Sequence, residues 1–146
     1  MKIARAAFEA IQAHGAEGYP NEICGILVGL PGGDVITEVR RAANIIGQPR
    51  SRWQFTSERT VDRYDMDPLD QMRVDKEVRV AGLDILGYYH SHPDHPAQAS
   101  VFDAEQSWAG YFYLIVSVEH GTPVDAKVFV GEKDNGPFHP EPLEVV

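Results

Sequence analysis

Two histidines, His90 and His92, are separated by a single residue and follow an apolar stretch of the sequence. On an extended backbone, residues two positions apart point to the same side, with Cα atoms roughly 6.5–7 Å apart. Both imidazoles can therefore reach one ion, and neutral imidazole suits zinc and its first-row neighbours. Asp103 follows in the sequence and could supply a carboxylate oxygen. Two histidines and one carboxylate leave a fourth tetrahedral position open, which is typical of a catalytic rather than a structural metal site.

The same residues also have an interpretation that needs no metal. A His-x-His pair alone is weak evidence for a metal site. Ser100 and Asp103 have the spacing of a capping box, in which the serine caps a helix and the acid is its third residue. Capping alone would account for both residues. The two interpretations are partly compatible, because a residue at a helix start is held rigidly and aimed in one direction.

The elements that must position these residues can be predicted from apolar periodicity and from capping and turn residues. The patterns predict helices over 2–14, 67–81 and 101–108, and strands over 23–28, 35–41, 83–89, 111–118 and 124–130. Gly15 is expected to stop the first helix, and residues 90–100 are expected to form a loop. Strand 23–28 is apolar on both alternating faces, so both faces of its sheet should be covered. This mixture indicates the α/β or α+β class, with helices on a mixed sheet.

Two stretches have no clear periodicity. Residues 44–66 are polar and aromatic, and Trp53 to Phe55 could form a short strand. A long irregular segment in a compact domain is often functional, although a solvated loop is an equally good interpretation. Residues 132–146 contain three prolines and are expected to wrap over the surface.

Composition limits the classes of protein to consider. The 146 residues fit one domain, and 13 basic against 22 acidic side chains give a net charge of −9. This charge argues against nucleic acid or an anionic membrane as a partner and permits a basic protein partner. Cys24 is the single cysteine, which fits a reducing compartment. There is no signal-like segment and no apolar run near the length of about 20 that a membrane span needs, so we expect a soluble, cytoplasmic protein.

Taken together, the chemistry-bearing residues resemble the signature of the JAMM metalloproteases, also called MPN-plus domains. The signature begins with His-Ser-His-Pro at His90. Seven residues separate His92 from Ser100, and two residues separate Ser100 from Asp103. Glu22 lies far upstream, before an apolar strand. The resemblance covers residues 1–131. It implies a single JAMM/MPN domain with a mixed sheet flanked by helices, cytidine-deaminase-like in fold, with residues 132–146 as a C-terminal tail packed on the same domain.

The resemblance also implies a role for each residue of the signature. His90, His92 and Asp103 would bind one zinc ion per chain. Glu22 would act as general acid/base toward the attacking water, and Ser100 would help stabilise the tetrahedral oxyanion. Every element is intact, unlike in the inactive scaffold members of the family, so a zinc metalloprotease is expected.

Within the family, the short single domain and the segment from Tyr64 to Gln71 resemble the bacterial branch. That branch is associated with small ubiquitin-like sulfur-carrier proteins that end in Gly-Gly. The implied reaction is hydrolysis of the amide or isopeptide bond after Gly-Gly, releasing an amino acid such as cysteine or a short extension. A Gly-Gly tail suggests a narrow cleft beside a sheet edge, with Trp53, Phe55 and Tyr64 as candidate contacts.

Other functions compete with this interpretation. A non-catalytic MPN-type binding module could use the same residues for a structural metal. Cys24 could be a thiol nucleophile, although a buried core cysteine is the simpler interpretation. A zinc deaminase would need His-x-Glu near Pro-Cys-x-x-Cys, which this chain lacks. The sequence leaves open the identity of the carrier, the need for a partner chain and the formation of a homodimer.

Overall fold

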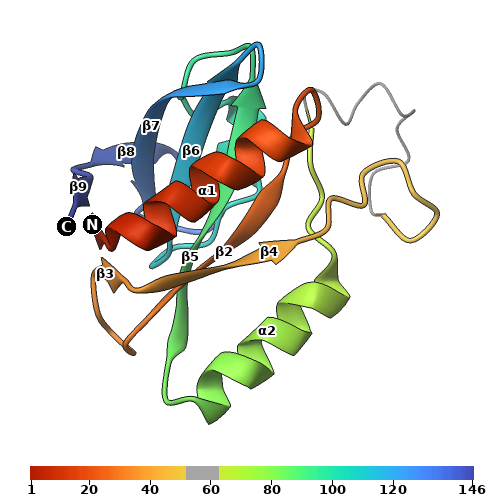
Figure 1. Ribbon diagram of the computed structural model, residues 1–146. Helices are drawn as coiled ribbons and strands as arrows, with labels where there is room; N and C mark the ends of the chain where they lie inside the picture. The colour runs from red at the N-terminus through yellow and green to blue at the C-terminus, as the bar shows by residue number, and fades with distance from the viewer. Residues whose placement is uncertain (52–62) are drawn as a thin grey trace.

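A computed structural model describes residues 1–51 and 63–146 of the chain (Figure 1). Its centre is a six-stranded sheet in the order β4-β2-β5-β6-β7-β8. These strands are β4 (Glu38–Ala42), β2 (Cys24–Gly29), β5 (Asp84–Pro93), β6 (Phe112–Glu119), β7 (Thr122–Gly131) and β8 (Phe138–Glu141). β5 and β6 run parallel and the other neighbours run antiparallel, so the predicted mixed sheet is confirmed.

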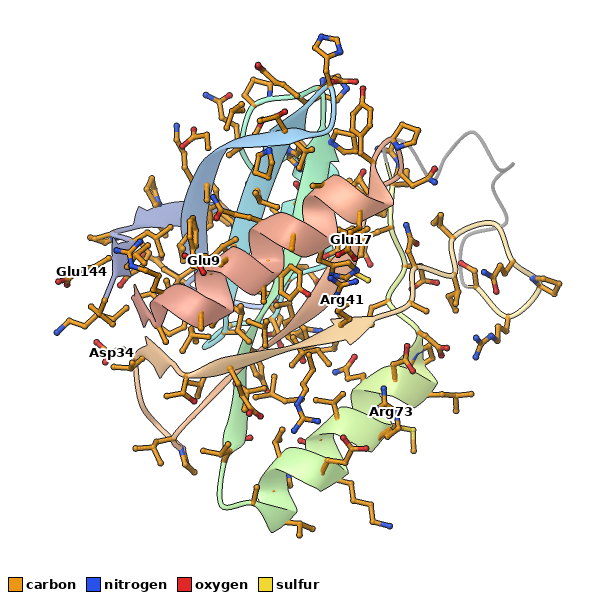
Figure 2. All side chains as sticks on the ribbon, viewed as in Figure 1. Glu9, Glu17, Asp34, Arg41, Arg73 and Glu144 are labelled. Atoms are coloured by element: carbon orange, nitrogen blue, oxygen red, sulfur yellow. The ribbon has the colours of Figure 1, made fainter. Side chains whose placement is uncertain are left out.

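The two long helices cover opposite faces of this sheet. α1 (Arg5–Gly18) crosses the strands on one face, where Ile11 packs with Leu27 in one apolar cluster. α2 (Pro68–Val80) buries Val74 against Ile26 in a second cluster on the other face. Every residue of β2 is buried as a result, as its continuous apolar pattern predicts. An ion pair of 2.6 Å between Glu17 and Arg41 also ties α1 to β4 (Figure 2).

The predicted bounds of the first helix were wrong at both ends. Residues 2–3 form a strand, β1 (Lys2–Ile3), which lies between β3 (Val35–Ile36) and β9 (Glu144–Val145) in a small parallel sheet. Gly15 does not stop the helix, because it is a close-packing position. A Cβ added there would lie 3.0 Å from Val118, so the missing side chain lets α1 approach β6.

The second helix agrees with its prediction. The Asp67 side chain accepts a hydrogen bond from the Leu69 N–H at 3.0 Å, and Gly82 follows the helix with φ of +78°. Such an N-cap and a glycine in the left-handed region are the expected start and stop signals. α3 (Val101–Glu105) is shorter than the predicted 101–108, since the Trp108 N–H donates to the Tyr113 hydroxyl instead of continuing the helix.

Residues 132–146 contribute to both sheets. β8 pairs with β7 at the edge of the large sheet, and β9 pairs with β1 in the small one. The amino group of Met1 donates to Glu141 at 3.2 Å and to the Pro142 carbonyl at 2.8 Å. Both chain ends are therefore held in regular structure. In the ranges 1–51 and 63–146, no helix has the length and apolarity needed to cross a membrane.

Candidate metal and catalytic site

Strand register brings Glu22 next to the histidines. Cys24 of β2 is the partner of His90 in the antiparallel neighbour β5, and the Ser91 N–H donates to the Ile23 carbonyl at 3.1 Å. Continuing this register one residue beyond Ile23 and Ser91 places Glu22 opposite His92. Alternate residues of a strand share a face, so both histidines and the glutamate lie on the face of the sheet that α2 covers. One ligand atom from each of these three side chains lies within 4.8 Å of the others.

The histidines lie on a strand and not in the predicted loop. β5 continues to Pro93, whereas the sequence predicts a strand that ends at residue 89. The reason is the parallel pairing with β6, in which His90 is the partner of Ile115 and His92 the partner of Ser117. This pairing keeps the backbone extended through residues that are common in loops.

Asp103 joins the two histidines. Its Oδ1 lies 3.1 Å from Nε2 of His90, and its Oδ2 lies 3.1 Å from Nε2 of His92. The two Nε2 atoms are 3.2 Å apart. The predicted capping box is also present: the Ser100 N–H donates to the Asp103 carboxylate at 2.9 Å, and the Asp103 N–H donates to the Ser100 hydroxyl oxygen at 3.0 Å. One carboxylate therefore caps α3 and faces both histidines, so the capping interpretation is confirmed and the geometry is compatible with a metal ligand at Asp103.

The orientation of the His92 ring fits a bound cation. Its Nδ1 lies 2.8 Å from the Pro96 carbonyl oxygen, which can only accept, so Nδ1 is the protonated nitrogen. In the neutral ring, Nε2 then directs a lone pair at His90 and Asp103. A metal-binding histidine commonly donates its other N–H to a carbonyl in this way. A carboxylate and imidazole lone pairs that converge at this separation form a donor set suited to a zinc-like ion.

Charge in the metal-free cluster is strongly coupled. Burial works against a charged Asp103, but the neighbouring His90 and the hydrogen bonds from His90, His92 and Ser100 hold the pKa of that carboxyl well below its usual range. Burial likewise opposes protonation of His92, yet the hydrogen bond and charge of Asp103 raise its pKa. Both shifts report the same thing, a buried anion aimed at imidazole nitrogens.

The loop after β5 holds the Pro96 carbonyl in place. Ser117, a buried residue of β6, donates its hydroxyl to the His95 carbonyl at 2.6 Å. This contact fixes the loop one residue before the carbonyl that orients His92. Ser117 and Pro96 were not predicted from the sequence, because a backbone carbonyl has no sequence signature and a serine in a strand has many uses.

Two further residues position Glu22. The Ile23 N–H donates to the Ser91 hydroxyl at 2.9 Å, and the Asn44 amide donates to the Glu22 carbonyl at 3.1 Å. Glu22 itself is buried, with 5% of its surface exposed. The positioning roles of Ser91 and Asn44 were not predicted from the sequence either. A hydroxyl inside a buried strand requires a hydrogen-bond partner, but the sequence predicts a loop at Ser91, so this signal was not available.

Of the three candidate substrate contacts, Tyr64 lies beside the histidines. Its ring stacks on His90 with 4.6 Å between centroids and 25° between planes. This places Tyr64 against a candidate metal ligand, and Tyr64 also lines a small cavity of about 90 Å³. Trp53 and Phe55 lie outside the described residues.

A cavity of about 290 Å³ opens onto the cluster. Glu22, His92, Asp103 and Ser100 line it, together with Arg63, whose guanidinium lies 4.8 Å over the Phe102 ring. Ser100 is exposed to this space, whereas Glu22 and Asp103 are buried at its base. The cavity can therefore hold a cation, a water beside the Glu22 carboxylate and a carbonyl group near Ser100.

Cys24 does not have the properties of a nucleophile. It is fully buried, and its thiol lies 3.7 Å from the Ala42 carbonyl. Burial, followed by the charge of Glu22, raises the pKa of this thiol far above its usual range. A thiolate is the reactive form, so the alternative of cysteine-based catalysis has no support in the structure.

The chain is similar to one protein family over most of its length. A family model described as prokaryotic homologs of the JAB domain matches residues 4–130. A desampylase from Haloferax volcanii is 32% identical over 122 residues, which is 80% of this chain and 80% of that protein.

Several solved structures are similar to this chain over its whole length. The solution structure of a protein from Desulfitobacterium hafniense covers all of this chain and 93% of its own, with 30% identity and a TM-score of 0.78. A solution structure from Salinibacter ruber covers all of this chain and 92% of its own, with 34% identity and a TM-score of 0.70. A JAB1/MPN domain protein from Archaeoglobus fulgidus, at 21% identity, shares the fold over the whole chain and 97% of its own, with a TM-score of 0.61.

Proposed function

The chain belongs to the family of prokaryotic homologs of the JAB domain, and from that premise we propose that it is a zinc-dependent isopeptidase that acts on ubiquitin-like proteins. Its assignment as a hydrolase follows from the family and the desampylase relative. The observation that carries the proposal is the convergence of Glu22, His90 and His92, with Asp103 in contact with both imidazoles. The catalytic domain would span residues 1–131, with 132–146 as a tail packed on it.

His90, His92 and Asp103 would hold the ion. A bound zinc would supply Lewis acidity toward the scissile carbonyl and the attacking water. The ligands are held by neighbouring groups, since Tyr64 stacks on His90 and the Pro96 carbonyl accepts from His92. Such preorganisation keeps the site in one geometry.

Glu22 would move the proton. Its carboxylate lies close enough to His92 to accept a proton from a water molecule that attacks the carbonyl carbon. When the amide C–N bond breaks, the same carboxyl group returns the proton to the leaving nitrogen, so that an amine is released. Burial of Glu22 excludes bulk water from this transfer.

Ser100 would stabilise the oxyanion. Its oxygen accepts the Asp103 N–H, and its own O–H can be directed into the cavity, because the residue is exposed. A hydrogen bond from this hydroxyl would meet the charge that develops on the carbonyl oxygen.

The proposal also includes a substrate class. We propose a small ubiquitin-like sulfur carrier that ends in Gly-Gly and is joined to an amino acid such as cysteine or to a short extension. The cavity of about 90 Å³ beside Tyr64, Met66 and Trp108 supports this assignment, since it has room for a glycine backbone but little room for side chains. Trp53, Phe55 and Tyr64 remain the proposed contacts of the tail.

The test combines metal content with cleavage. Wild type and His90→Ala would be analysed by mass spectrometry for bound metal and for release of cysteine from a carrier ending in Gly-Gly-Cys. We expect about one zinc per chain in wild type, loss of that zinc in the variant, and cleavage that a chelator stops and added zinc restores. A matched carrier with Ala-Ala before the cysteine should resist cleavage. Zinc-loaded protein that cleaves neither carrier would refute the proposal and favour the non-catalytic binding module.

A further inference from the structure

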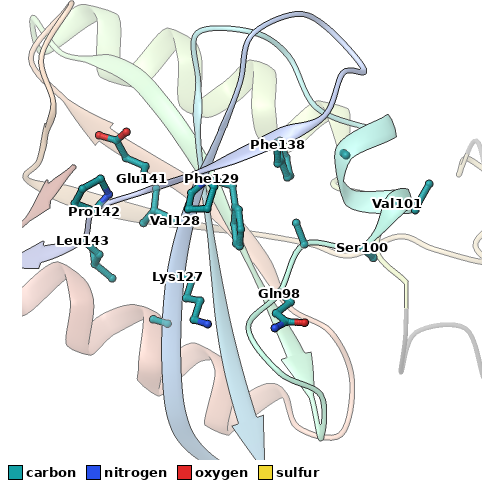
Figure 3. Close-up of a pocket in the computed structure, with 14 residues that line it drawn as sticks. Gln98, Ser100, Val101, Lys127, Val128, Phe129, Phe138, Glu141, Pro142 and Leu143 are labelled. Atoms are coloured by element: carbon teal, nitrogen blue, oxygen red, sulfur yellow. The ribbon is translucent and has the colours of Figure 1, made fainter.

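A large apolar groove adjoins the candidate site. It has a volume of about 960 Å³ and lies between the start of α3, the strand β7 and the segment that follows β8 (Figure 3). Gln98, Ala99 and Ser100 line both this groove and the cavity over Glu22. The loop that carries the proposed oxyanion donor is thus a wall shared by the two spaces.

Among the residues that the structure describes, the lining of the groove is mostly apolar. Val101, Ala104, Phe129, Phe138 and Leu143 contribute apolar side chains. Val101 is 75% exposed. The charged side chains of the groove are Glu141 and Lys127, both labelled in Figure 3. Since Glu141 is bonded to the amino group of Met1, the exposed Lys127 is the charge that the groove can offer to a ligand.

Two cavities of very different size flank α3. Val101 and Ala104 line the groove of about 960 Å³, whereas Gln106 and Trp108 line the cavity of about 90 Å³. The wide apolar space adjoins the site at Ser100, whereas the narrow space lies at the other end of α3. The narrow space suits glycines, and the wide one suits residues with apolar side chains.

We propose that this groove binds the segment on the leaving side of the scissile bond: an extended peptide with apolar side chains and a carboxylate that pairs with Lys127. The inference rests on the proposed function and adds a substrate class to it. On a protein with a net charge of −9, a cation set in an apolar groove selects an acidic group and disfavours a basic one. The enzyme would accordingly prefer carriers with a short acidic and apolar extension over carriers with a polar extension.

The test uses four carriers that differ only after Gly-Gly. The extensions are Leu-Phe-Ala-Glu, Ser-Ser-Ala-Glu and Leu-Phe-Ala-Gln, and the fourth substrate ends in a single cysteine. For wild type we expect kcat/KM to be about tenfold higher for the first extension than for the second. It should be about two- to fivefold higher for the first extension than for the third. The difference should reside in KM, because the contacts are equal in the ground and transition states.

Variants in the groove should change these ratios selectively. Val101→Ser should reduce the preference for the apolar extension, and Lys127→Gln should abolish the preference for Glu over Gln. Neither variant should alter cleavage of the single-cysteine carrier. Val124→Ser is the matched control, because Val124 is also exposed on β7 but does not line the groove.

Binding is measured separately from cleavage. Fluorescence anisotropy of labelled carriers with Glu22→Gln protein should show the same ranking of extensions. If wild type cleaves all extensions equally, the inference is wrong and the proposed function stands. If no carrier is cleaved, the proposed function is wrong. If the extensions also bind with equal affinity, the inference is wrong as well. A sedimentation mass that falls from dimer to monomer in Val101→Ser would also overturn it, because a second copy would then cover the groove.

Discussion

The two faces of the large sheet bury histidines in opposite ways. On the α1 face, His14 is buried with its Nδ1 2.8 Å from the Tyr89 hydroxyl. Burial, with a smaller contribution from Arg41, lowers the pKa of His14 to about 4. On the α2 face, the next residue of β5, His90, and its neighbour His92 meet the Asp103 carboxylate instead. A hydroxyl partner leaves a neutral histidine that fills the core, whereas a buried carboxylate prepares a site for a cation.

The two faces differ in what surrounds their buried histidines. Burial alone does not mark a functional histidine, since His14 and His90 are both buried. His92 differs from His14 in having a carboxylate at one ring nitrogen and a backbone carbonyl at the other. Asp103 lies at Nε2 of His92, and the Pro96 carbonyl lies at Nδ1.

The largest difference should come from Glu22→Gln on the α2 face. The amide cannot accept the proton of the attacking water, so turnover should fall by about 10²- to 10⁴-fold. Metal content should remain that of wild type, because His90, His92 and Asp103 are unchanged. His14→Gln on the opposite face is the control and should retain turnover. A near-wild-type rate in Glu22→Gln would eliminate Glu22 as the proton acceptor.

Asp103→Asn should remove the metal but keep the helix cap. An amide oxygen can still accept from the Ser100 N–H, whereas the charge that draws a cation between His90 and His92 is lost. We expect metal content, measured by mass spectrometry, to fall from about one ion per chain to nearly none. Circular dichroism of the metal-free proteins should be alike. Normal zinc binding by the variant would show that Asp103 is a cap alone.

Ser117→Ala should weaken metal binding without touching a ligand. Loss of its hydrogen bond to the His95 carbonyl loosens the loop that presents the Pro96 carbonyl to His92. Changes of this kind reduce metal affinity by about 10- to 100-fold, which competition with a chelating dye would measure. Ser117→Thr retains the hydroxyl and should restore affinity. Equal affinity in Ser117→Ala and wild type would assign Ser117 to packing only.

The smallest effect concerns the pH dependence of stability on the α1 face. The pKa of His14 is lowered in the folded state, so the unfolded chain takes up a proton first as the pH falls. The contribution of His14 to the free energy of unfolding is therefore present in full above about pH 6.5. It is lost progressively between pH 6.5 and about 4. Urea unfolding of the metal-free protein should show that stability falls more steeply with falling pH for wild type than for His14→Gln over this window. Parallel curves for the two proteins would contradict the assignment.

Much of the site could be predicted because its residues are close in sequence. His90, His92, Ser100 and Asp103 span one strand end and one helix start, so local spacing reports their proximity. Glu22 is different, because only the register of β2 on β5 brings it there. Periodicity contains no register between distant strands, and Glu22 entered through resemblance to a family.

The errors in the predicted fold have a common physical cause. Gly15 continues a helix, and residues 90–93 continue a strand, because packing and pairing outweigh local preference. For the same reason, residues 132–146 form strands despite their prolines. Tertiary contacts of this kind leave no mark in a single sequence.

The carboxylate shared by the cap of α3 and the histidines links two equilibria. A helix of five residues is far too short to persist alone. Its first turn is closed by Asp103, the group that faces His90 and His92, so any ion that draws this carboxylate inward also acts on the helix. Loading with metal should then slow hydrogen exchange at the α3 amides that donate to Ser100 and Phe102, those of Ala104 and Gln106. The site would thereby report its own occupancy through the order of the helix beside it.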